Sequence, residues 1–445
     1  KINLMPLSKY INNISALQFF QIFRFGVLLL ISILFTKTHL AVREIGIYET
    51  ILFLAGAVSF FWLSGLIQSL LPLYKNNKQT DKKNPAVFNA FLLISFFSLL
   101  ASGIIYFART PITSSIGNAD IIPYIDLLCL YVLLSGPANL AEYIYLLTGQ
   151  AKKLIYYGII SMTLQLLFVA LPVVLGYPII WGITGLVIIS GLRVLWLLRL
   201  IFIHSGFSLN IPFIKEHLSL GYPLILSALL SGSAQYINDY IVSVYYDSET
   251  FAVFKYGAKQ FPLIVLLASS FSNAMVPEFS GRPIPEVLSE IKRKSLKLMH
   301  LLFPATMVLL LTSHWLYPFV FNKMFQESAS IFNILLLLVI SYMVFPQTVL
   351  IGLKKTKQIL FISLLEISLL ISLSLILINF MGVRGVAAAT VIAYCLERIF
   401  LILIIYKFIK IPPSAYIPLK KYLVYVVLLS AAFTASCFIH ASVCS

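Results

Sequence analysis

Two stretches of the sequence, GIYETILFLAGAVSFFWLSGLIQSLLP at residues 46–72 and FAVFKYGAKQFPLIVLLASSFSNAMVP at residues 251–277, decide the fold. Each is a long apolar run that ends in proline, and the two prolines lie 205 residues apart. Two further pairs have nearly this separation: LLTGQAKKLIYYGII and LIGLKKTKQILFISL are offset by 203 residues, and WGITGLVII and MGVRGVAAA by 200. Three widely spaced pairs with almost one offset predict that the chain consists of two similar halves.

The chain around these stretches is apolar throughout. Of its 445 residues, 60% are hydrophobic and 11% are charged, and the mean hydropathy is +0.96. This composition excludes a soluble multidomain protein. Apolar runs bounded by charged residues, proline or glycine predict twelve membrane spans and a candidate thirteenth. They lie near residues 16–36, 46–74, 86–108, 121–148, 154–176, 179–203, 219–246, 251–277, 298–321, 328–352, 358–381, 385–408 and 422–442.

The repeat and the spans together predict the architecture. Six spans per half is an even number, so the two halves have the same orientation and are related by an axis along the membrane normal. We expect an all-α polytopic membrane protein with two pseudo-symmetric six-helix lobes around a central cavity. The predicted domains are an N-terminal lobe at 1–204, a cytoplasmic linker at 205–218, a C-terminal lobe at 219–410 and a tail with the candidate thirteenth helix at 411–445.

The distribution of lysine and arginine predicts the orientation. Of 32 such residues, 22 lie at the N-terminus and in alternate connections, five lie in the opposite connections and five lie inside spans. Because cytoplasmic loops carry the excess of positive charge, the N-terminus is predicted to be cytoplasmic. This bias also explains the net charge of +16 without a nucleic-acid partner. No connection is long enough to fold as a catalytic domain.

Motifs for covalent chemistry or metal binding are missing from the sequence. The four cysteines are scattered without paired spacing, and the six histidines form no ligand pattern. There is no nucleotide-binding loop and no nucleophile motif. A cleavable signal peptide is not expected either, because the first apolar run contains Arg24 and no small-residue cleavage site follows. The sequence therefore predicts no enzymatic activity, no catalytic residue, no metal and no cofactor.

The stretch Gly221–Ser280 resembles the seventh and eighth helices of the MOP superfamily. It opens with Gly-x-Pro, carries Asp239 late in its first helix, passes through an aromatic-rich turn and closes with Pro-Glu. The GIYE segment at Gly46 and the run NKMFQESASIFNILLL from Asn322 also resemble this group, and the similarity covers residues 16–410. Within the superfamily, whose fold is MATE-like, the chain looks most like the Wzx-type polysaccharide flippases.

This resemblance implies a function and partners. A Wzx-type flippase moves undecaprenyl-pyrophosphate-linked oligosaccharides from the cytoplasmic to the periplasmic leaflet of the bacterial inner membrane, for synthesis of lipopolysaccharide O-antigen, capsule or exopolysaccharide. The implied partners are this lipid-linked substrate, membrane lipids, a proton or sodium ion, and the polysaccharide polymerase and chain-length machinery. Two alternatives remain, a MATE-type multidrug or cation antiporter and a lipid II flippase. Cations inside the spans favour an anionic substrate over cationic drugs.

Arg24 is the first candidate substrate ligand. It lies about eight residues, or ~12 Å, into the first span. Charges inside lipid spans are costly and usually face a protein interior or a water-filled cavity. A guanidinium fork matches the oxygens of a pyrophosphate, so we expect Arg24 to bind the headgroup. The alternative is that Arg24 extends to the interface or pairs with an acid.

A second group of charges lies in the predicted seventh and eighth spans. Lys255 and Lys259 are four residues apart and are expected on one helix face, where they are candidate pyrophosphate ligands. Asp239 lies eight residues before the turn acid Asp247, which places it at the depth of these lysines and predicts an ion pair. Asp239 is therefore a candidate for ion coupling. A permanent salt bridge is the structural alternative.

The remaining intramembrane candidates are weaker. Glu366 lies about eight residues into the eleventh span and is the second candidate for ion coupling. Tyr236 and Asn238 are candidates for contact with sugar, and the alternative is that they join helices. The other charges are expected to be structural. Glu49, Asp126 and Glu142 are expected to reach interfacial water and Arg193 to extend to the interface, whereas Glu397 and Arg398, being consecutive, are not expected to pair with each other.

Overall fold

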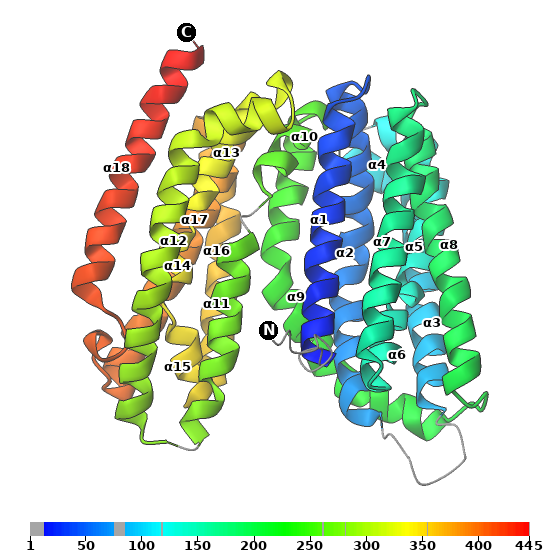
Figure 1. Cartoon of the computed structure of the whole chain (residues 1–445), viewed down its shortest axis with the longest axis horizontal. Coiled ribbons are helices and arrows are strands. Elements are labelled where there is room, and N and C mark those ends of the chain that lie inside the picture. Colours follow the sequence, from blue (N-terminus) through cyan, green and yellow to red (C-terminus); the bar gives the residue numbers. More distant parts are fainter. Residues whose placement is uncertain are drawn as a thin grey trace, which may run out of the picture. The chain divides into compact units, whose positions relative to one another are not determined.

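The computed structural model describes residues 13–74, 85–116, 119–259, 262–280, 282–353 and 355–444, and these ranges contain helices and no strands (Figure 1). The first half of the chain forms α1 (Asn13–Thr36), α2 (Val42–Leu73), α3 (Ala86–Phe107), α4 (Arg109–Ile116), η2 (Ala119–Tyr124), α5 (Ile125–Ala138), α6 (Leu140–Leu147), α7 (Ala151–Val174), α8 (Ile179–His204) and α9 (Ile211–Tyr245). The rest forms α10 (Ser248–Gly257), α11 (Pro262–Met275), η3 (Pro277–Ser280), α12 (Ile284–Val320), η4 (Lys323–Phe325), α13 (Gln326–Leu336), α14 (Val339–Tyr342), α15 (Pro346–Gly352), α16 (Thr356–Met381), α17 (Val383–Ile404), η5 (Ile405–Ile409), η6 (Pro413–Ala415) and α18 (Leu419–Cys444).

Eleven helical stretches among the described residues are long and apolar enough to cross a membrane. They confirm the predicted all-α membrane class, and they include Leu419–Phe438, the candidate thirteenth span. The predicted spans at 219–246 and 251–277 are not among them. The first corresponds to α9, which carries several polar side chains, and the second is divided between α10 and α11.

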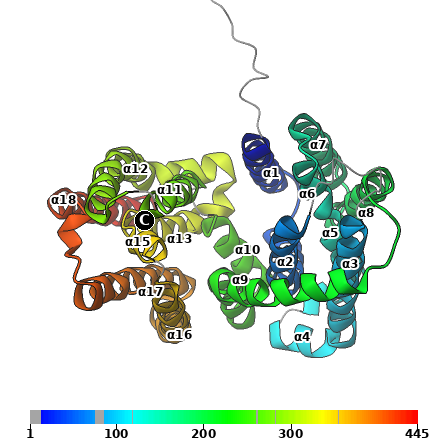
Figure 2. The same cartoon turned by 90° about the horizontal axis from the view of Figure 1, so that it is seen from below.

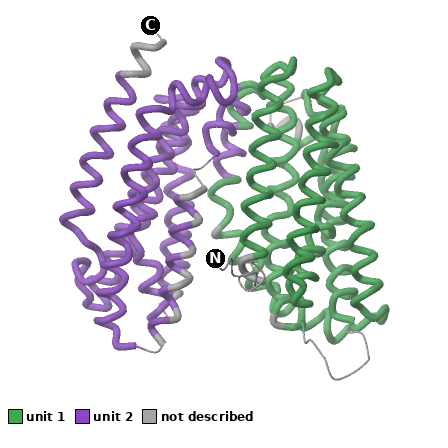
Figure 3. Tube along the Cα trace, viewed as in Figure 1, with its two compact units in different colours: residues 1–236, 243–249 green, residues 237–242, 250–445 purple. Residues whose placement is uncertain are grey.

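The chain forms two compact units (Figure 3). Unit 1 contains residues 1–236 and 243–249, and unit 2 contains residues 237–242 and 250–445. Helix α9 therefore contributes residues to both units, whereas the repeat predicted a boundary at the linker before it. The predicted linker at 205–218 is also largely helical, because α9 begins at Ile211. The division into lobes at 204 and 219 rests on the repeat and stays a prediction.

Unit 1 is a bundle in which α9 packs along α2. A Cβ added at Gly65 of α2 would lie 2.6 Å from the backbone nitrogen of Ile225 in α9, so the two backbones need a glycine here to approach. His217 also contacts the Leu66 carbonyl oxygen through Nε2 at 2.8 Å. Figure 2 shows α1, α2 and α6 side by side within this unit, and all three pack against one another.

Unit 2 contains two closely packed helix pairs. Helices α16 and α17 form a tight hairpin at Gly382, whose φ of 59° lies in the left-handed region that glycine adopts without strain. Helix α18 packs on α12. The His300 ring contacts Tyr425 and His314 contacts the Ser436 carbonyl oxygen, so residue numbers rise together along both helices and the pair is parallel.

The predicted span at 328–352 is three short helices, α13, α14 and α15. In an apolar 18-residue window of the stretch Lys323–Gly352 that contains them, 72% of the residues are buried inside the protein. Non-helical backbone at membrane depth is tolerated where protein surrounds it, and interrupted helices line many transport sites. The break before Pro346 places Gln347 at the start of α15, facing α17.

Candidate functional site

Unit 1 contains a cavity of about 220 Å³ between α1, α2 and the junction of α5 and α6. Helix α5 ends at Ala138, directly after Pro137, and α6 starts at Leu140, so the chain bends at this junction. The lining combines charged, amide, hydroxyl and apolar side chains. It consists of Gln21, Arg24, Phe60, Leu63, Ser64, Ile67, Gln68, Leu71, Asn139, Glu142 and Tyr143.

Arg24 reaches this cavity from α1 and is the only lysine or arginine among the described residues that line it. No hydrogen bond or ion pair joins Arg24 to another side chain in the part of the chain that the structure describes. Its guanidinium donors are thus available to a ligand in the cavity. The expectation that Arg24 lies in a cavity wall agrees with this geometry, and its binding of a headgroup stays a prediction.

Two acids that were expected to reach interfacial water are buried instead. Glu49 is 5% exposed and Glu142 is 4% exposed, whereas Asp126 is exposed as expected. The expectation was wrong for Glu49 and Glu142 because it used distance from the helix ends and ignored the helices packed around them. Glu142 is a lining residue of the cavity that the sequence did not single out as a site residue.

Arg193 also differs from its prediction. Its Nη2 donates hydrogen bonds to Gln165 Oε1 at 2.7 Å and to the Ser161 carbonyl oxygen at 3.2 Å, both on the neighbouring helix α7. The expectation that Arg193 extends to the interface was therefore wrong. An internal amide and a carbonyl group thus replace interfacial water for Nη2, whereas the buried Nε has no hydrogen-bond partner among the described residues.

A partly buried ion pair lies in unit 2. Lys255 Nζ and Asp239 Oδ2 are 2.9 Å apart, with side-chain exposures of 16% and 3%. This distance confirms the predicted pair. Lys259 does not share a helix face with Lys255, because α10 ends at Gly257, with Pro262 following. The Lys259 ammonium lies 4.0 Å from the centroid of the Tyr256 ring instead.

Tyr236 and Asn238 fall in different units despite their closeness in sequence. Tyr236 stacks on Phe60 at a centroid distance of 4.3 Å within unit 1. Asn238 donates from Nδ2 to Thr390 Oγ1 at 2.8 Å within unit 2, which joins α9 to α17. These contacts are those of helix packing, and contact of either side chain with sugar stays a prediction.

A third charged group surrounds α17. Gln347 Nε2 donates to Glu397 Oε1 at 2.6 Å, and Arg398 Nε lies 3.3 Å from Glu397 Oε2. The expectation that Glu397 and Arg398 do not pair was therefore wrong, since side chains can bend together although their Cα atoms point apart. Glu366 on α16 interacts electrostatically with both Glu397 and Arg398, and it is partly buried. Gln347 was not predicted, because an uncharged residue in an apolar run gives no signal before the helix break is known.

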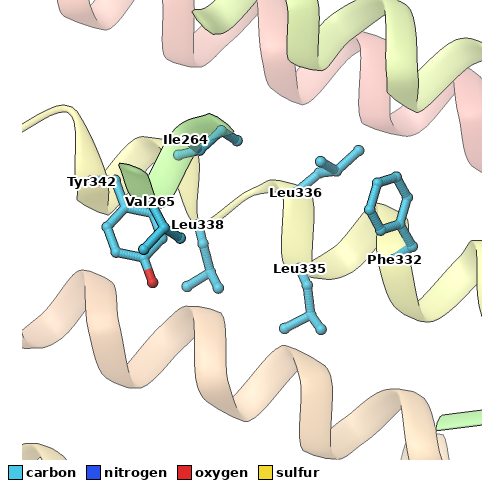
Figure 4. Close-up of a pocket in the computed structure, with 7 residues that line it drawn as sticks. All are labelled: Ile264, Val265, Phe332, Leu335, Leu336, Leu338 and Tyr342. Atoms are coloured by element: carbon cyan, nitrogen blue, oxygen red, sulfur yellow. The ribbon is translucent and has the colours of Figure 1, made fainter. Parts of the chain in front are cut away.

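Unit 2 also contains a small apolar cavity of about 10 Å³, shown in Figure 4. Ile264 and Val265 of α11 meet side chains of α13 and α14 there, among them Phe332 and Tyr342. This volume holds about one water molecule at most. It has no room for a sugar or a pyrophosphate group.

The whole chain matches solved structures of transporters. It matches the lipid II flippase MurJ in an inward closed conformation with a TM-score of 0.68 and 18% identity, over 97% of this chain and 98% of that chain. It matches an inward-facing multidrug resistance MATE family transporter of the MOP superfamily with a TM-score of 0.63 and 13% identity, over 92% and 98%. It matches a Vibrio cholerae MATE transporter with a TM-score of 0.57 and 13% identity, over 89% of this chain and 97% of that chain. The fold is that of MOP-superfamily transporters.

The sequence shows the family. The model of a family described as polysaccharide biosynthesis protein matches residues 39–330, which is more than half of the chain. The chain belongs to this family, and the resemblance to MOP-superfamily polysaccharide flippases is confirmed. A comparison with curated proteins gave no match.

Proposed function

We propose that this protein flips undecaprenyl-pyrophosphate-linked oligosaccharide repeat units from the cytoplasmic to the periplasmic leaflet of a bacterial inner membrane. The product would supply O-antigen, capsule or exopolysaccharide synthesis. The observation that carries the proposal is the 220 Å³ cavity of unit 1, whose wall contains Arg24 together with amide and hydroxyl side chains. A guanidinium in such a site can bind phosphate oxygens in bidentate geometry, and the amide side chains can form hydrogen bonds with sugar hydroxyls.

Transport needs no covalent step in this proposal, so the protein is not an enzyme. The headgroup enters the cavity while the prenyl tail stays in lipid, and alternating access exposes the headgroup on the other side. Asp239 and Glu366 are the proposed ion-coupling residues. Protonation of Asp239 would weaken its attraction for Lys255, 2.9 Å away, and would make that ammonium more attractive to an anion.

The alternatives are less well supported. Multidrug antiporters that take cationic drugs need an acidic site, whereas the described lining of this cavity pairs one acid, Glu142, with the cation Arg24 and is not net acidic. A lipid II flippase handles a similar headgroup, but the likeness to one at 18% identity concerns the fold, whereas the matched family is one of polysaccharide biosynthesis.

The test is deletion of the gene, followed by labelling of undecaprenyl-linked oligosaccharides with an impermeant sugar reagent. We expect the lipid-linked sugar to be labelled only after cell lysis, and surface polysaccharide to disappear. Asp126→Asn, at an exposed acid outside the cavity, is the matched control and should restore export, whereas Arg24→Ala should not. Normal surface polysaccharide in the deletion strain, with no accumulated intermediate, would contradict the proposal.

A further inference from the structure

The cavity at Arg24 contains an acid as well as a base. Glu142 lies in the first turn of α6, is 4% exposed and lines the same cavity as Arg24. Its carboxyl makes no hydrogen bond or ion pair with any residue that the structure describes. A carboxylate that faces a cavity from a buried residue is less well hydrated than one at the surface, and such a group relieves the cost by binding a proton or by attracting a cation.

The surroundings of Glu142 contain two permanent cations. Arg24 of α1 and Arg193 of α8 both act electrostatically on its carboxyl, and Arg193 is already bonded to Gln165. The other groups near it are neutral at physiological pH. They are Tyr143 of α6, Tyr157 of α7, Tyr131 of α5 beside the two arginines, and the uncharged Ser64 and Gln68 of α2 in the cavity wall.

We propose that Glu142 sets the charge of this cavity and couples binding of the anionic headgroup to uptake of one proton. When Glu142 is ionised, it offsets the charge of Arg24 and repels an anion. When Glu142 is protonated, Arg24 presents an uncompensated positive charge to a pyrophosphate. Proton and anion therefore bind together. This inference rests on the proposed function, in which Arg24 binds a pyrophosphate group.

The test measures binding of farnesyl pyrophosphate to the purified full-length protein in detergent between pH 6 and pH 8.5. The variants are Glu142→Gln, Arg24→Ala and the control Asp126→Asn. The probe ionises in the same way with every variant. The ratio of the wild-type Kd to the Glu142→Gln Kd therefore isolates the effect of Glu142 ionisation on binding. We expect this ratio to rise on the order of tenfold with pH. Asp126→Asn should follow the wild type.

The outcomes separate the two proposals. A ratio that stays constant with pH, while Arg24→Ala loses binding, overturns the role of Glu142 alone. Binding by Arg24→Ala as tight as that of the wild type overturns the headgroup site itself. If Glu142→Gln does not fold, binding can be measured by calorimetry of the wild type at pH 8 in two buffers of different ionisation enthalpy. The difference gives the number of protons taken up or released per farnesyl pyrophosphate bound. A pyrophosphate bound to a guanidinium releases protons, so net uptake identifies a protein carboxyl, and net release overturns the proposal.

Discussion

At the scale of single residues, the Asp239–Lys255 pair shows how the protein accommodates opposite charges in its interior. Asp239 is buried and Lys255 is partly buried, and the two charged groups lie 2.9 Å apart. Removing one partner of a buried ion pair is strongly destabilising in general, whereas replacing both by neutral groups of similar size is often nearly neutral for stability. The pair can therefore be separated into its structural and its functional contribution.

We predict that Lys255→Ala lowers the free energy of unfolding by about 3 kcal/mol, because it leaves Asp239 buried without this partner. The double variant Asp239→Asn/Lys255→Met should recover most of that stability. If Asp239 couples transport to an ion, the double variant folds and does not export polysaccharide. Thermal unfolding in detergent and surface polysaccharide are the two measurements. Recovery of both stability and export would make the pair a structural salt bridge only.

A second prediction concerns the shape of the charge at Arg24. Arg24→Lys keeps a positive charge in the cavity but loses the planar fork. We expect Arg24→Lys to retain a fraction of export, on the order of a tenth, and Arg24→Ala to lose it. Each variant is expressed at several levels in the deletion strain, and the surface polysaccharide is measured at each level. Blotting checks that equal amounts of each variant reach the membrane. Equal export by all three proteins would remove Arg24 from the site.

Sequence reasoning located charged residues well and judged their surroundings less well. Arg24, Asp239 and Lys255 stand out in apolar runs, and the hairpin geometry correctly placed the last two together. Glu142 and Arg193 were misjudged because burial depends on which face of a helix is covered, and the hydrophobic pattern of a membrane helix does not distinguish a lipid-facing side from a protein-facing side. The partners Gln165 and Gln347 carry no charge and give no such signal.

At the scale of elements, glycines decide how closely α2 and α9 pack. A Cβ at Gly65 would lie 2.4 Å from a side-chain carbon of Ile225 and 2.6 Å from its backbone nitrogen. We predict that Gly65→Ala destabilises the protein by about 1–3 kcal/mol through overpacking. Gly103→Ala in α3 is the matched control, because nothing lies within 4 Å of its added Cβ. A lower unfolding temperature for both variants alike would contradict this explanation.

The parallel packing of α12 and α18 makes a prediction about topology. If α12 runs from the cytoplasm outward, as the charge distribution predicts, then α18 runs outward too. In a cysteine-free background, Lys421→Cys should react with an impermeant maleimide only in lysed cells, and Phe438→Cys should react in intact cells. Labelling of both positions from one side would show that α18 does not cross.

Helix interruptions limited the prediction of elements. The spans were found from composition, but α13, α14 and α15 lie in one apolar run whose breaks no residue type marks except Pro346. Tertiary packing holds this backbone, since it is the most buried of the eleven spans, and packing is not visible in a hydropathy pattern.

At the scale of the whole molecule, the repeat and the charge bias were the informative signals. Composition and apolar runs predicted the all-α membrane class, a shared offset near 200 residues predicted two similar halves, and the uneven distribution of lysine and arginine predicted an orientation that stays a prediction. The observed units divide the chain inside α9, so internal similarity and packing give different boundaries. Similarity reports ancestry, whereas packing reports which side chains meet after folding.

The predicted orientation has a direct test. Asp247→Cys, in the exposed turn between α9 and α10, should be labelled from outside intact cells, and Arg293→Cys, exposed near the start of α12, only after lysis. Both follow from the rule that positive loops stay inside. The reverse pattern would invert the proposed direction of transport as well.

The acid and the base that share one cavity also have an electrical consequence. A charge that crosses the full membrane voltage changes energy by about 2.3 kcal/mol per 100 mV. Moving each negative charge of a pyrophosphate out of a negative cell interior is favourable by this amount. Moving one proton outward on Glu142 is unfavourable by the same amount and cancels the gain from one of those charges. Replacing that carboxyl by an amide would then increase the net negative charge moved out per molecule flipped. Transport by the variant would therefore depend more strongly on the membrane voltage than transport by the natural protein.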